Sequence, residues 1–274
     1  MGERVAILIG NRTFEPSSGL EPLKYPERDV IDLAAILRDR DIGRFDVVIP
    51  IIDQPSLQIK LAIEKMLKQN LGAFVLIFYS GHGRVSDSNR LYLAARDTQE
   101  DLLVATAVRF DDIIEMKENT GHSRVGIILD CCFAGLGQDA VKGSAEDQVK
   151  AIVSGKGIFF IGASSSIQHA KEDDSLAHGL LTAAIIDGLK GGKAARDNDG
   201  TIKVSDLFDY CRAFMSTRAK QIPVCLNKID GADIVVSFSR PKLSDTDLEA
   251  IRAKLKLCRD HQLLFESDLK RLGA

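Results

Sequence analysis

The chain of 274 residues contains no tryptophan, and aromatic residues make up only 6% of it. No apolar run reaches the roughly 18 residues that a membrane-spanning helix needs, so no membrane contact is expected. The N-terminus passes directly into a strand-like run, without the apolar core and cleavage site of a signal peptide. Lysine and arginine are interspersed with acidic residues, and the net charge is -3, which gives no reason to expect a nucleic-acid partner.

Cysteine is also scarce. The chain has five cysteines, an odd number spread over a long sequence, which indicates reduced thiols and a cytoplasmic location and not a disulfide framework. Nucleotide-binding fingerprints are missing as well. The first strand-like run ends in Gly10-Asn11-Arg12-Thr13, which is neither G-x-G-x-x-G nor a P-loop, so a nucleotide-binding domain is excluded.

Most of the chain alternates apolar runs of strand length with segments of helical periodicity. This alternation predicts an α/β fold with a six-stranded, mostly parallel sheet covered by helices on both faces. A helix is expected from about Glu27, and Ser56 is expected to cap the next one. The expected strands are residues 4–9, 46–52, 74–79, 125–129, 157–162 and 234–238.

Pro241 marks a predicted boundary between a domain at 1–240 and a helical extension at 241–274. The apolar stripe of the extension either braces the domain or docks an activating partner. The polar connection at 135–156 contains three lysines, Lys142, Lys150 and Lys156. It is either a loop cut after one of these lysines during self-processing or a plain flexible connection.

Two of the apolar runs end in short turns that carry a reactive side chain. One ends in Ser80-Gly81-His82-Gly83, and the other ends in Asp130-Cys131-Cys132 followed by Phe133-Ala134-Gly135. If the two strands are neighbours in a parallel sheet, both turns open at its carboxyl edge, where open α/β sheets place their sites. A thiol is a strong nucleophile, and a nearby histidine activates it further. His82 and one of the two cysteines are therefore predicted to meet in space.

The order and spacing of these motifs resemble those of the caspase-like cysteine peptidases, in their prokaryotic, metacaspase-like branch. A histidine about 50 residues before the cysteine is a caspase feature, and His82 and Cys132 have this spacing. The metacaspase motif Asp-x-Cys-x-Ser-Gly aligns without gaps with residues 130–135, which puts Cys132 at the nucleophile position. The likeness covers about residues 4–238 and implies a caspase-like three-layer sandwich.

The resemblance implies a cysteine endopeptidase that acts on protein or peptide substrates through a thioester acyl-enzyme. Cys132 would attack the peptide carbonyl, and His82 would protonate the leaving amine. The main-chain N–H groups of Gly83 and Cys132 would hold the oxyanion. No third member of a triad is evident. The alternative is a catalytically silent caspase-fold interaction or scaffold module.

The resemblance also implies a specificity. Asp130, Ser80 and Asp29 match residues that line the S1 pocket of metacaspases, where carboxylates select basic side chains by charge pairing. Asp130 has the alternative interpretation of a turn cap. Animal caspases carry an arginine four residues before the aspartate of the first helix, and here that position is Tyr25. Cleavage after Arg or Lys, and not after Asp, is therefore expected.

The remaining cysteines and histidines give weaker signals. Cys131, Cys211 and Cys225 are expected in the core, whereas His169 and His178 are expected at the surface or in the substrate groove.

Residues 197–202 resemble half a calcium loop, but Ala195 stands where the first ligand would be, so a plain turn is the better interpretation. No metal or other cofactor is predicted, although many metacaspases are activated by calcium and that question stays open. By analogy with prokaryotic relatives, a partner in a signalling or defence assembly would regulate the peptidase.

Overall fold

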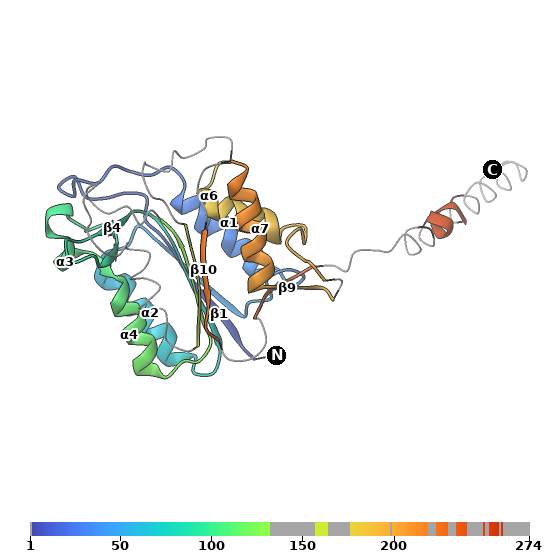
Figure 1. Cartoon of the computed structure of the whole chain (residues 1–274), viewed down its shortest axis with the longest axis horizontal. Coiled ribbons are helices and arrows are strands. Elements are labelled where there is room, and N and C mark those ends of the chain that lie inside the picture. The colour runs from blue at the N-terminus through green and yellow to red at the C-terminus, as the bar shows by residue number, and fades with distance from the viewer. Residues whose placement is uncertain are drawn as a thin grey trace, which may run out of the picture.

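A computed structural model describes residues 2–131, 157–163, 176–197, 199–218, 223–229, 234–239, 249, 252–257 and 259. It confirms the predicted α/β sandwich, with one six-stranded sheet between two layers of helices (Figure 1). Cys132, His169 and the connection at 135–156 lie outside the described residues.

The main sheet has the strand order β10-β8-β7-β3-β1-β2. Its strands from β2 to β8 are parallel, and only β10 runs antiparallel to its neighbour β8. The register aligns Gly10 of β1 with Ser80 of β3, and Ser80 with Asp130 of β7. The carboxyl ends of these three strands therefore lie side by side. The strands are β1 (Arg4–Gly10), β2 (Val47–Ile52), β3 (Phe74–Ser80), β7 (Val125–Asp130), β8 (Ile158–Ala163) and β10 (Pro223–Asn227).

Helices cover both faces of this sheet, which is why its central strands are apolar except at their ends. In β1, Ala6 and Leu8 belong to one core, and Ile7 and Ile9 belong to the other. The first core is closed by α1 (Pro26–Arg38), α6 (Leu180–Leu189) and α7 (Val204–Ser216). The second is closed by α2 (Ser56–Gln69) and α4 (Phe110–Thr120).

A small three-stranded sheet lies beside the turn that follows β3. It consists of β4 (Gly83–Val85), β5 (Leu91–Leu93) and β6 (Val108–Arg109), with η1 (Glu100–Leu102) and α3 (Leu103–Thr106) between its last two strands. This arrangement attaches the His82 turn directly to strand β4.

The prediction that residues 234–238 form the sixth strand of the main sheet is wrong. β11 (Val235–Phe238) pairs with β9 (Thr201–Lys203) in a separate two-stranded sheet. The buried Arg4 donates hydrogen bonds to the carbonyl oxygens of Val235 and Val236 at 3.0 and 2.7 Å, which keeps β11 beside the amino end of β1. The sixth strand of the main sheet is β10, which begins with Pro223 at the sheet edge, where a missing N–H is tolerated.

Two smaller predictions concern a cap at Ser56 and a helix in the C-terminal extension. Ser56 is the first residue of α2 and not its cap; its N–H and hydroxyl groups bond to the Asp97 carboxylate at 2.8 and 3.3 Å. Residues 252–257 are helical, and Leu255 and Leu257 in them are exposed. Among the described residues, no helix is long and apolar enough to cross a membrane.

Candidate active site

The two motif turns lie next to each other at the carboxyl edge of the main sheet. β3 and β7 are neighbours, and Ser80 is paired with Asp130. The N–H of Gly81 donates to the carbonyl of Asp130 at 3.4 Å, which links the first turn to the second strand. The sequence-based prediction that the two strands end together is confirmed.

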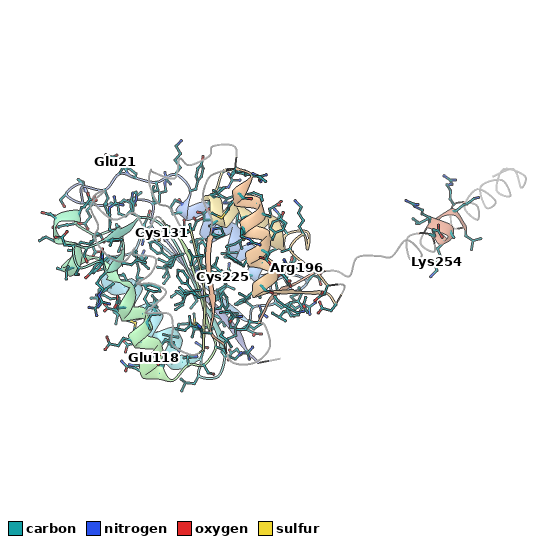
Figure 2. The ribbon with its side chains drawn as sticks, in the orientation of Figure 1. Glu21, Glu118, Cys131, Arg196, Cys225 and Lys254 are labelled. Carbon is teal, nitrogen blue, oxygen red and sulfur yellow. The ribbon has the colours of Figure 1, made fainter. Side chains whose placement is uncertain are left out.

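The His82 side chain is half-buried, and two groups from the loop after β1 contact it. Its Nε2 atom lies 2.8 Å from the carbonyl oxygen of Glu21, and its ring centroid lies 5.3 Å from that of Phe14. Because a carbonyl only accepts, this hydrogen bond assigns the proton to Nε2 and leaves Nδ1 as the basic atom of the neutral ring. The main chain of Glu21 thus helps to orient the ring. Figure 2 shows Glu21 on the loop at the edge of the domain.

Tyr79, in strand β3, supports the main chain of the His82 turn through its hydroxyl group. The Tyr79 hydroxyl lies 2.9 Å from the carbonyl oxygen of His82 and 2.8 Å from that of Ala94, and the N–H of Ala94 donates to the His82 carbonyl at 2.9 Å. Burial raises the pKa of Tyr79 well above its ordinary value, so the hydroxyl stays a neutral donor. A Cβ at Gly81 would stand 2.4 Å from this hydroxyl, which explains the glycine before the histidine.

Gly83 and the two cysteines are the other residues predicted for the catalytic site. Gly83 begins β4 directly after His82 and is paired with Leu93. Cys131 is buried in the core beside α2 and α4, as predicted, and Figure 2 shows it inside the domain. Cys132 follows it in the chain and lies outside the described residues, so the predicted contact between its thiol and His82 stays a prediction.

Asp29, Ser80 and Asp130, the predicted S1 residues, form one group, here called the carboxylate cluster. Asp29 projects from α1, is completely buried, and accepts a hydrogen bond of 2.7 Å from the Ser80 hydroxyl. The N–H of Gly179, at the start of α6, donates to both oxygens of Asp29 at 3.2 and 3.4 Å. The two strand ends and two helices therefore meet around these carboxylates.

Asp130 also acts as a cap on the first turn of α6. Its Oδ2 atom accepts hydrogen bonds from the N–H and hydroxyl of Thr182, at 2.8 and 2.6 Å. This contact joins residues 52 positions apart and is not the cap of a local turn that the sequence suggested as an alternative. Burial and, secondarily, the charge of Asp29 raise the Asp130 pKa from 3.8 to about 6, although the bonds from Thr182 act in the opposite direction. A cap does not prevent the same carboxylate from facing a ligand.

Gly179 occupies the space between the two carboxylates. A Cβ at this position would lie 2.3 Å from Oδ2 of Asp130 and 3.2 Å from Oδ2 of Asp29. Only a residue without a side chain fits there. No sequence motif pointed to this position as part of the site.

His178 does not lie at the surface, which was one of the two expected placements. Its side chain is only 11% exposed and packs against α1, with Nδ1 2.9 Å from Oδ1 of Asp29 and Nε2 3.3 Å from Oδ2 of Asp32. Sequence analysis missed this role because the partners lie about 150 residues away in the chain.

The remaining candidates have structural roles in the described part of the chain. Cys211 is buried, and Cys225 is partly buried against the same core, as predicted. Residues 199–201 form a turn in which Asp199 accepts from the N–H and hydroxyl of Thr201 at 2.8 and 2.7 Å. Lys203 lies 2.8 Å from Asp197 and 3.6 Å from Asp199, so both acidic side chains are neutralised by a lysine.

Comparison with known proteins agrees with this architecture. Caspase-1 from Spodoptera frugiperda has a similar solved structure, with a TM-score of 0.55 over 88% of this chain and 92% of that one. The two sequences are 14% identical, so this likeness shows the fold alone. No curated protein matches the chain. The model of the caspase domain family matches residues 3–231, and the chain therefore belongs to this family of cysteine peptidases.

Proposed function

We propose that this protein is a cysteine endopeptidase that cleaves protein substrates after arginine or lysine, with Cys132 as nucleophile and His82 as general acid and base. One observation carries the specificity: Asp29 and Asp130 come together at the sheet edge that also holds the His82 turn. The family supports the peptidase chemistry, and the carboxylate cluster supports a basic P1 residue, the one whose carbonyl is attacked.

The proposed reaction follows from the groups at the sheet edge. Nδ1 of His82 accepts the thiol proton, and the Cys132 sulfur attacks the substrate carbonyl. The N–H groups of Gly83 and Cys132 stabilise the oxyanion. His82 then gives its proton to the leaving amine, and the resulting thioester is hydrolysed by a water molecule that His82 deprotonates. The Glu21 carbonyl, 2.8 Å from Nε2, stabilises the imidazolium that forms between these steps.

Charge favours a basic P1 side chain. The raised pKa of Asp130 shows that its negative charge is costly when buried near Asp29. A guanidinium or ammonium group that approached the carboxylate cluster would offset this repulsion, whereas an acidic side chain would increase it. Tyr25, which begins the turn into α1, brings no positive charge for an acidic P1 residue.

The experiment is a set of fluorogenic peptides that differ only in P1: Arg, Lys, Asp or Ala. The wild type should hydrolyse the Arg and Lys peptides, and Cys132→Ala should hydrolyse none. Asp130→Asn keeps an acceptor for Thr182 but removes the charge, so it should lower kcat/KM for the Arg peptide by about 10- to 100-fold. Unchanged turnover in this variant would refute the assignment of Asp130. If the wild type cleaves none of these peptides, the catalytically silent scaffold is the better description.

We also propose that the peptidase is regulated, either by self-cleavage at 135–156 or by a partner that docks on 241–274. The three lysines of the connection match the proposed specificity, and Leu255 and Leu257 offer exposed apolar contacts. Intact masses of wild type and Cys132→Ala should differ if self-cleavage occurs, and identical masses would exclude it. The proposed chemistry uses no metal or other cofactor, and assays with calcium and with EDTA test calcium activation. The odd number of scattered cysteines supports a cytoplasmic location.

A further inference from the structure

His178 lies between two carboxylates of α1 in the described structure. Nδ1 makes a hydrogen bond of 2.9 Å to Oδ1 of Asp29, and Nε2 lies 3.3 Å from Oδ2 of Asp32. Asp29 and Asp32 are three residues apart and thus share one face of the helix. The imidazole therefore joins the buried carboxylate of the cluster to a half-exposed one at the surface.

The two contacts differ in kind. Nδ1 donates a hydrogen bond to Asp29, because a carboxylate oxygen accepts, whereas the 3.3 Å between Nε2 and Asp32 is an ion-pair distance. Among the described residues, Arg28 lies 3.4 Å from the same Asp32 oxygen, and Asp130 lies on the far side of Gly179 from Asp29. Arg28 therefore shares the Asp32 carboxylate with the His178 ring.

The backbone before His178 is also held in an unusual conformation. Ala177 has a φ of 54°, in the left-handed region that non-glycine residues seldom adopt. Such a conformation persists when surrounding contacts maintain it. The turn thus brings His178 to Asp29 and, one residue later, places the Gly179 N–H on the same carboxylate.

We propose that His178 is a positioning residue for substrate specificity. Its hydrogen bond to Oδ1 holds the Asp29 carboxylate in the orientation that receives the P1 side chain. The inference rests on the proposed function and extends it to a residue outside the catalytic and S1 motifs.

The test compares two histidine variants at matched positions. His178→Gln keeps one donor but cannot bridge both carboxylates. His122→Gln is the control, because His122 is also buried and bonds to the Leu67 carbonyl at 2.7 Å, between α2 and α4. For the Arg peptide, His178→Gln should lower kcat/KM by about 10- to 100-fold, and His122→Gln should leave it within about twofold.

Two further measurements separate positioning from general damage. Iodoacetamide is neutral and small, so its rate of reaction with Cys132 reports the dyad without the P1 site, and this rate should be the same in His178→Gln and wild type. Asp32→Asn, at a half-exposed side chain, should fold normally and reduce Arg cleavage in the same direction but by less. A reduced kcat/KM with an unchanged alkylation rate supports the proposal.

The opposing outcomes are distinct. If the wild type cleaves after Arg or Lys and His178→Gln does so equally well, the positioning role is refuted and the proposed function stands. If His178→Gln slows alkylation as much as cleavage, His178 supports the dyad or the fold and not P1 recognition, which also overturns the proposal. If the wild type cleaves after neither Arg nor Lys, the proposed specificity and the role of His178 fail together.

Discussion

Asp130→Asn is expected to change how the stability of the protein depends on pH. The Asp130 carboxylate is buried at the end of β7, close to Asp29, and its pKa is raised from 3.8 to about 6 by burial first and by the Asp29 charge second. Asparagine has nearly the same shape and still accepts from Thr182, but it carries no charge at any pH. The variant therefore isolates the cost of ionising this carboxylate in the folded protein.

The sign and size follow from proton linkage. Between about pH 4 and pH 6 the folded state holds a proton on Asp130 that the unfolded chain has lost, so the stability of the wild type falls as pH rises through this range. The difference between 3.8 and about 6 corresponds to about 3 kcal/mol above pH 6, at about 1.4 kcal/mol per pH unit. Below about pH 4 Asp130 is protonated in both states, and the penalty vanishes.

The assay is urea unfolding of both proteins from about pH 4 to about pH 8, in a Cys132→Ala background that prevents self-cleavage. The free energy of unfolding of Asp130→Asn minus that of its parent should rise by up to about 3 kcal/mol across this range. Asp87→Asn, on an exposed turn, measures the general effect of removing one carboxylate. A difference for Asp130→Asn that stays constant with pH would refute the argument that its charge is costly in the fold.

Three other substitutions or reactions test neighbouring parts of the site. Gly179→Ala places a methyl group against both carboxylates of the cluster, so Arg-peptide cleavage should fall by at least about tenfold, with a lower midpoint in thermal unfolding. Tyr79→Phe removes the hydroxyl bond to the His82 carbonyl at 2.9 Å, and kcat should fall by roughly 10-fold with little change in KM; an unchanged kcat would contradict the support role. Burial raises the pKa of the Cys211 thiol, so iodoacetamide at about pH 8 should label Cys132 well before Cys211, as peptide mass spectrometry can show; equal labelling would contradict this.

Much of the fold could be predicted because the signals are local and redundant. The alternation of strands and helices and the fully apolar runs of β1, β3 and β7 are enough for a parallel sheet covered on both faces. The assignment of the sixth strand failed because an apolar pattern does not name the partner of a strand. β10 begins with a proline, which disfavours a strand in a sequence-based prediction. β11 has an apolar pattern typical of a strand, but Arg4 holds it at the amino end of β1.

Some residues of the site could be predicted from sequence motifs, and others could not. Ser80 and Asp130 could be placed together from the motifs, since each ends a strand. Asp29 joins the group by a bond of 2.7 Å to Ser80. Glu21 could not be found, because it acts through a carbonyl group that every residue has. His178 could not be found either, because its role depends on a contact between a loop and a helix that are far apart in the sequence.

The costly charge of Asp130 connects recognition with stability. A cationic P1 side chain that lies near Asp130 lowers its pKa, so binding below about pH 6 must displace a proton and binding above it need not. Affinity for a basic substrate should therefore increase as pH rises through about 6, in the same range in which the free protein loses stability. Substrate binding should then restore stability where the unbound carboxylates repel each other most. Measuring the inhibition constant of a peptide aldehyde with P1 Arg between about pH 5 and 8, for wild type and Asp130→Asn, tests this link. A pH dependence that is the same in both proteins would show that another group controls binding.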